Sequence, residues 1–164
     1  MSSRAEVAAT AREMHRLGLA PGTTGNVSVR AGDVVWITAA GAPYEAMTEA
    51  DVVPIADERR SSEWRLHAAV YAARPDVGAI VHTHSAHATR WSESGAALDA
   101  GGPVPTAPFA PSGTDEIAAG AVAALGGGHG VLLARHGVVG VGGTLDRALG
   151  VCVEIERAAE AAAP

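Results

Sequence analysis

The sequence predicts one α/β domain in which helices cover a mostly antiparallel sheet. Three observations support this fold class. The chain of 164 residues is long enough for a single core. Helical and strand-like segments alternate irregularly along it, and neighbouring strands are joined by short turns, as in hairpins. We find no internal repeat and no linker long enough to divide residues 1–164, so we expect one domain.

The first segments predict a helix followed by a β-hairpin. Apolar residues recur at helical spacing over 4–18, and Gly18 marks the end of that helix. A loop rich in glycine and hydroxyl groups comes next. Strands are expected over 27–31 and 34–38, because Gly32 and Asp33 can form a tight turn between them.

Residues 39–60 are expected to form a loop-rich connection with a short helical piece near 48–52. A helix is then expected to begin after Ser61 or Ser62, since serine is a favourable N-cap residue, and to end near Ala73. An Arg-Pro-Asp sequence breaks the chain after it.

An apolar strand over 79–84 leads into a helix that reaches about Glu93. Residues 94–113 are rich in Gly, Pro and Ala and are expected to be the least regular part of the chain. Thr114 then begins a helix over about 114–125, which three consecutive glycines end.

The final part predicts a second pair of strands and a last helix. The strands are expected near 130–134 and 138–142, and Thr144 caps a helix that extends to about 162. Cys152 lies in this helix and, as the single cysteine, cannot form an internal disulfide. A nucleophilic role for Cys152 has little support, because the helix is apolar and shows no obvious base nearby.

Composition narrows the function classes. Aromatic residues make up only 4% of the chain and alanine much of its 48% hydrophobic content, so we expect a core of closely approaching helices and strands. A net charge of −6 gives no electrostatic support for nucleic-acid binding. We expect a cytoplasmic protein, because the sequence lacks a secretory signal and a membrane-length apolar stretch, and its lone cysteine suits a reducing compartment.

Histidines at strand ends are the most informative feature. His82 and His84 follow an apolar strand two residues apart, so their side chains can point the same way. His136 ends another apolar run. Three imidazoles with an open position are the ligand set of a catalytic zinc site, but each histidine alone could simply be an ordinary strand-end residue.

A helix start supplies a candidate base. Glu63 is expected in the first turn of its helix, where the helix dipole favours a carboxylate whether or not it is catalytic. His67 lies four residues later on the same face, and we interpret it as a packing residue or as a neighbour of the site rather than a ligand.

Several glycines and hydroxyl residues could bind a phosphate without lysine or arginine. Exposed backbone N–H groups and side-chain hydroxyls at a helix start are suitable donors, although each such residue alone is equally typical of a turn. The candidates are Thr23, Gly25, Asn26, Gly41, Ser61 and Ser62.

Taken together, these elements resemble the class II aldolase/adducin family, most closely its L-fuculose-1-phosphate aldolases. The resemblance spans most of residues 5–160, and its SSEWR, H-x-H and L-L-x-x-H-G elements occur in the family's order. The matching segments are 16–30, 37–53, 61–89 and 132–149.

The resemblance implies a three-layer α/β/α fold with the sheet between helical layers. It implies Zn²⁺ bound by His82, His84 and His136, with Glu63 as the catalytic acid/base. It also implies that the six candidates above bind the substrate phosphate. Related enzymes assemble as fourfold-symmetric homotetramers with active sites at subunit interfaces.

The chain departs from the family pattern in three places. Ala40 replaces a serine or threonine whose hydroxyl would reach the phosphate. The 92–113 segment lacks the tyrosine that donates a proton in a neighbouring subunit's site, and Tyr44 and Tyr71 look structural. The chain stops at Pro164, without the family's usual C-terminal tail.

The leading interpretation is a zinc-dependent aldolase that cleaves a small ketose 1-phosphate to dihydroxyacetone phosphate and an aldehyde. A metal-dependent epimerase, dehydratase or decarboxylase is the second, because the tyrosines are missing. A non-catalytic adducin-like module is the third, but it predicts decayed metal ligands. Imidazoles also accept other divalent transition metals in place of zinc.

Overall fold

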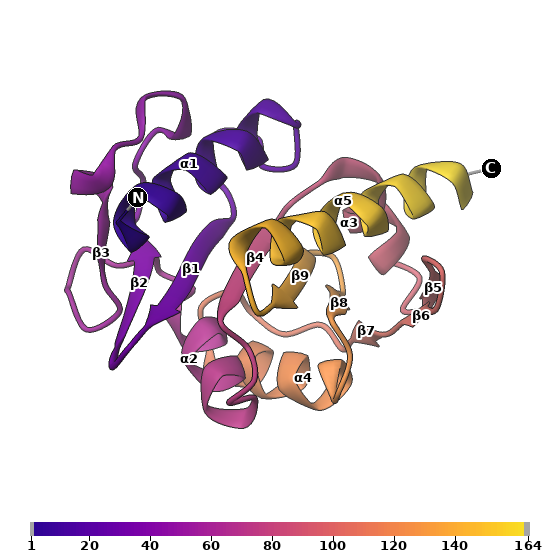
Figure 1. Cartoon of the computed structure of the whole chain (residues 1–164). Helices are drawn as coiled ribbons and strands as arrows, with labels where there is room; N and C mark the ends of the chain where they lie inside the picture. Colours follow the sequence, from indigo (N-terminus) through magenta and orange to yellow (C-terminus); the bar gives the residue numbers. More distant parts are fainter. Residues whose placement is uncertain (1, 163–164) are drawn as a thin grey trace.

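The computed structural model describes residues 2–162 and has three layers (Figure 1). A central sheet has helices on both faces. One face carries α1 (Ser3–Arg16), α3 (Ala86–Ser92) and α5 (Leu145–Ala162), and the other carries α2 (Trp64–Ala73) and α4 (Asp115–Leu125). The predicted α/β/α architecture is confirmed.

The central sheet has the strand order β3-β2-β1-β4-β9-β8-β7. Every neighbouring pair is antiparallel except β7 and β8, which run parallel. A separate two-stranded sheet pairs β5 (Leu98–Asp99) with β6 (Pro103–Val104). The strands of the central sheet are β1 (Asn26–Ala31), β2 (Val34–Thr38), β3 (Val52–Pro54), β4 (Ala79–Thr83), β7 (Thr106–Ala107), β8 (Gly130–Leu133) and β9 (Gly137–Gly142).

Strand β4 occupies the middle of the sheet and is buried along its whole length. Its register places His82 opposite Asn26 of β1 on one side and Val139 of β9 on the other. Because alternate residues of a strand share a face, His82 lies on the same face as Ile80, which packs with residues of α2 and α4. The side chain of His82, near the end of β4, therefore lies on the face of the sheet that α2 covers.

Close approach between helix α5 and the sheet replaces aromatic packing. A Cβ at Gly140 of β9 would meet the carbonyl oxygen of Ala148, and a Cβ at Gly142 would meet the side chain of Arg147. Helix α5 can approach this closely only because neither glycine has a side chain, which confirms the expectation of closely approaching elements.

Among residues 2–162, no helix combines the length and apolarity needed to cross a membrane.

Two local predictions differ from the structure. Neither serine caps α2, because Glu63 occupies the N-cap position and makes no side-chain capping bond. Strand β3 lies within the predicted 39–60 connection, and β5, β6 and β7 lie within 94–113. These strands are two or three residues long, too short for an alternating pattern to reveal them.

The junction between β4 and β9 gives a test of the packing. A Cβ at Gly137 would collide with the backbone carbonyl of Thr83, so Gly137→Ala should lower the free energy of unfolding by roughly 1–3 kcal/mol. Gly120→Ala is the matched control, because a Cβ there meets nothing within 4 Å. Gly120 lies within α4, so its replacement should be neutral or stabilising by about 0.5–1 kcal/mol. Urea unfolding measures both, and equal effects would contradict the packing described.

Candidate active site

Three histidines from two parts of the chain converge at one end of the sheet. His82 lies in β4, His84 is the first residue after the end of β4, and His136 lies in the turn between β8 and β9. The Nε2 atom of His82 is 3.0 Å from that of His84 and 3.1 Å from that of His136. With a carboxylate oxygen of Glu63, one ligand atom from each of the four residues lies within 4.8 Å of all the others.

The turn that presents His136 has an unusual backbone. Arg135 has φ = 60°, the one positive φ at a non-glycine residue among those described. Its backbone N–H donates to the Ser92 hydroxyl at 3.0 Å, and the N–H of His136 donates to the carbonyl of Leu133. These bonds fix a conformation that an arginine rarely adopts, and so fix the position of the next residue, His136.

The orientation of His82 is set by the backbone of β9. Its Nδ1 lies 2.8 Å from the carbonyl oxygen of Val138, which can only accept, so Nδ1 carries a hydrogen. In the neutral ring Nε2 is then bare, and its lone pair points toward the other members of the cluster. A histidine that donates one ring N–H to a carbonyl and offers its other nitrogen is typical of a metal ligand.

Glu63 is buried and surrounded by donors. Its Oε1 is 2.8 Å from Nε2 of His136 and accepts from the Ser112 hydroxyl at 2.8 Å. Its Oε2 is 3.1 Å from Nε2 of His82 and accepts from Nδ2 of Asn26 at 3.0 Å. Burial favours the neutral acid, but the charge and hydrogen bonds of the histidines outweigh it and hold the pKa of Glu63 well below its usual range. The carboxylate is therefore ionised.

The donor set fits a divalent transition metal. Two nitrogens bound to one tetrahedral zinc at 2.0–2.1 Å lie about 3.3 Å apart, close to the separations of these imidazoles. Burial opposes a charge on His82, but the neighbouring carboxylate of Glu63 outweighs it and raises the pKa of His82, whereas burial lowers the pKa of His84. Imidazole nitrogens and a carboxylate oxygen are suitable ligands for such an ion.

A cavity of about 280 Å³ adjoins this cluster. Ser61, Ser62 and Glu63 line it just before α2 begins, so the positive end of the helix dipole faces the cavity. Every predicted phosphate residue lines it: Thr23, Gly25, Asn26, Gly41, Ser61 and Ser62. The structure thus brings these six together beside Glu63 and His84, and Ala40, whose side chain carries no hydroxyl, lines the same cavity.

Among the residues of the cavity wall that were not predicted, Ser112 and Tyr44 bear on the site. Ser112 comes from the segment expected only to be irregular, and its contact with Glu63 joins positions 49 apart in sequence. Tyr44 looked structural, and its hydroxyl does donate to the carbonyl of Gly25 at 2.5 Å, but it also lines the cavity.

Cys152 is fully buried, and burial raises the pKa of its thiol to about 12, which argues against a role as a nucleophile.

Comparisons with known proteins show the family to which the chain is similar. Residues 5–163 match the family described as the class II aldolase and adducin N-terminal domain. The chain is 39% identical over 163 residues to the L-fuculose phosphate aldolase of Escherichia coli strain K12, covering 90% of this chain and 76% of that protein. It is also 39% identical over 166 residues to the 5-methylthioribulose-1-phosphate/5-deoxyribulose-1-phosphate aldolase of Rhodospirillum rubrum, covering 92% and 75%.

A solved structure of L-fuculose 1-phosphate aldolase superposes with a TM-score of 0.90 and 30% sequence identity, covering 97% of this chain and 84% of that one. These similarities indicate a metal-dependent aldolase of the lyase class. The chain belongs to the class II aldolase and adducin family.

Proposed function

We propose that the protein is a zinc-dependent aldolase that reversibly cleaves a small ketose 1-phosphate into dihydroxyacetone phosphate and an aldehyde. One observation carries the proposal. The ionised carboxylate of Glu63 lies against three imidazole nitrogens at the wall of the cavity that contains all the candidate phosphate donors. In the proposal His82, His84 and His136 hold the metal, and Glu63 moves a proton.

The phosphate would bind in the cavity at the start of α2. The hydroxyls of Thr23, Ser61 and Ser62 are donors there, and the helix dipole favours an anion. The cavity needs no lysine or arginine for this. Binding a group remote from the reacting bond fixes the carbonyl end of the substrate relative to Glu63.

Aldol cleavage breaks a carbon–carbon bond. The hydroxyl on the departing carbon gives its proton to a group on the aldehyde side and becomes the aldehyde carbonyl, and the electron pair of the broken bond stays on the carbon next to the ketone. A zinc ion held by the three imidazoles would supply a Lewis acid that stabilises this negative charge. Glu63 returns a proton to that carbon in cleavage and removes it in synthesis. Asn26 and Ser112 each donate to one oxygen of the carboxylate and so hold it in place.

The aldehyde half of the substrate separates the two curated relatives, whose names specify different sugars at the same 39% identity. We therefore propose incubation with both L-fuculose 1-phosphate and 5-methylthioribulose 1-phosphate. Release of dihydroxyacetone phosphate from either supports aldol cleavage. A stereoisomer, or loss of water or carbon dioxide, would favour an epimerase, dehydratase or decarboxylase instead.

We further propose that the protein assembles as a homotetramer of fourfold symmetry, with sites at the subunit interfaces, as the family resemblance implies. In such an assembly a neighbouring subunit would line the aldehyde side of the site with groups other than the family's tyrosine, because every copy of the chain lacks a tyrosine in 92–113. Sedimentation equilibrium of the zinc-loaded protein gives the assembly, and a monomer with full activity would contradict this part of the proposal.

Metal analysis tests the ligand assignment. The protein purified without chelators should carry about one divalent transition metal per chain, and His84→Ala should lose most of it, because one of three imidazoles is gone. His87→Ala is the matched control, since its ring contacts Glu156 instead of the cluster. Plasma emission measurements that find equal metal in both variants would contradict the assignment.

Replacement of the proposed base separates binding from turnover. Glu63→Gln should keep the metal, because the three imidazoles remain, but should lower kcat by roughly 10²–10⁴-fold, the usual contribution of a general acid or base. Metal content and steady-state kinetics measure the two effects. Normal turnover in this variant would show that another group moves the proton.

Ala40 offers a gain-of-function test of the phosphate cavity. Ala40→Ser should restore a hydroxyl donor and lower KM by roughly two- to tenfold, since one hydrogen bond contributes about 0.5–1.5 kcal/mol. Ser62→Ala removes a hydroxyl from the same cavity and should raise KM. Inhibition by inorganic phosphate should follow the same order, and unchanged inhibition in both variants would place the phosphate elsewhere.

A further inference from the structure

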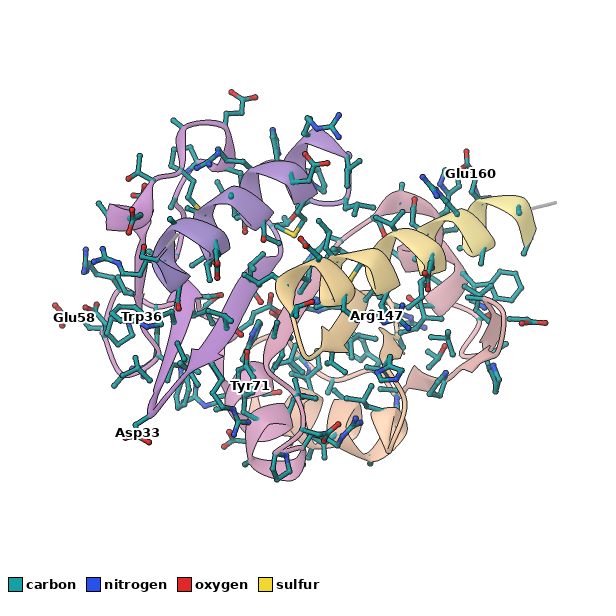
Figure 2. The ribbon with its side chains drawn as sticks, viewed as in Figure 1. Asp33, Trp36, Glu58, Tyr71, Arg147 and Glu160 are labelled. Atoms are coloured by element: carbon teal, nitrogen blue, oxygen red, sulfur yellow. The ribbon has the colours of Figure 1, made fainter. Side chains whose placement is uncertain are left out.

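A column of buried polar side chains extends from Glu63 into the layer between the sheet and helix α2. Asn26 and Ser28 are alternate residues of β1 and point to the same face. His67 and Tyr71 are four apart on α2 and also share a face. All are buried, His67 and Ser28 completely. Tyr71 is the member of the column farthest from Glu63 along its hydrogen bonds, and Figure 2 shows it where α2 meets the sheet.

The direction of the first hydrogen bonds follows from their acceptors. The carboxylate of Glu63 can only accept, so Asn26 turns its Nδ2 toward it. The Oδ1 of Asn26 then faces the Nε2 of His67, and because an amide oxygen also can only accept, that ring nitrogen carries the hydrogen.

The directions of the remaining hydrogen bonds follow from the charge state of the His67 ring. Its ring nitrogens contact only a neutral amide and a hydroxyl, which do not compensate a buried cation. Burial, with the nearby His82, lowers the pKa of His67 to about 3, so the ring is neutral. Its Nδ1 is therefore bare and accepts from the Ser28 hydroxyl at 2.7 Å. Ser28 in turn accepts from the hydroxyl of Tyr71 at 2.9 Å.

We propose that His67 is a positioning residue for Glu63, because it anchors a column in which every hydrogen bond donates toward the carboxylate. Ser28 and Tyr71 fix the ring tautomer of His67. The ring fixes the amide of Asn26, and the amide holds one carboxylate oxygen beside the three imidazoles. The inference rests on the proposed role of Glu63, and it extends that role to residues outside the cavity.

Two substitutions at one position separate hydrogen bonding from packing. His67→Leu removes both the donor and the acceptor, so kcat of the zinc-loaded protein should fall by roughly 10–100-fold, as expected for partners behind a metal site. His67→Gln keeps an N–H for Asn26 and an oxygen for Ser28, so it should recover most of the loss. Val70→Ala, in the same helix and fully buried, should lower stability but leave kcat unchanged.

A gentler variant covers the case in which His67→Leu fails to fold. Ser28→Ala deletes one hydroxyl and leaves Nδ1 of His67 without its donor, so kcat should fall by a smaller factor. Equal kcat in wild type, Ser28→Ala and any folded His67→Leu protein would overturn the proposal.

Nitrogen-15 NMR of the zinc-loaded protein gives a readout that needs no substrate. His67, assigned by the loss of its signals in His67→Gln, should show the neutral tautomer with hydrogen on Nε2. The other tautomer, or an imidazolium at neutral pH, would overturn the column even if aldol cleavage is normal. A protein with the expected tautomer but no cleavage of either sugar phosphate would contradict the proposed function and still support the directed column.

Discussion

The structure depends on the convergence of three imidazole nitrogens and one buried carboxylate at the end of β4. Such a group is costly to assemble, because an isolated buried charge loses its hydration. Here each carboxylate oxygen of Glu63 meets a ring nitrogen and a neutral donor, supplied by Asn26 and Ser112. The partners of Glu63 come from four segments: β1, β4, the turn between β8 and β9, and the 108–113 loop. The site therefore exists only when the sheet, α2 and this loop are all in place.

The two faces of the sheet are used differently. Toward α1, α3 and α5 the buried layer is made mostly of small and aliphatic residues, with glycines in β9 that let α5 approach. Toward α2 and α4 an apolar cluster surrounds the polar column that includes His67 and Ser28. A buried polar network is stable only when its members are satisfied, and this one has a partner at every step. The face that carries the chemistry is also the face that carries the polar core.

Much of the site could be predicted from sequence because its determinants are local. Strand alternation brings His82 and His84 to one side, and the apolar run before His136 indicated a strand end. The structure also gathers the glycines and hydroxyls around one cavity, although none of them alone was more than a turn signal. In the fold, the hairpin turn at 32–33 and the capping threonines at 114 and 144 could also be predicted from the local sequence.

The remaining features depend on contacts between distant segments. Nothing near Ser112 indicates that it meets Glu63, and nothing near Asn26 indicates which way its amide turns. The N-cap position of Glu63 was missed because serines precede it and are the stronger capping residues. The short strands of the 94–113 segment pair through tertiary context and have too few residues to show a period.

The most direct test of the account is an anomalous-scattering map at the zinc absorption edge, from crystals grown with zinc and phosphoglycolohydroxamate, a mimic of the charged reaction intermediate. The account predicts one strong peak among the Nε2 atoms of His82, His84 and His136, with the phosphate of the mimic in the cavity before α2. An ion bound elsewhere, or none at these imidazoles in well-ordered crystals, would contradict it.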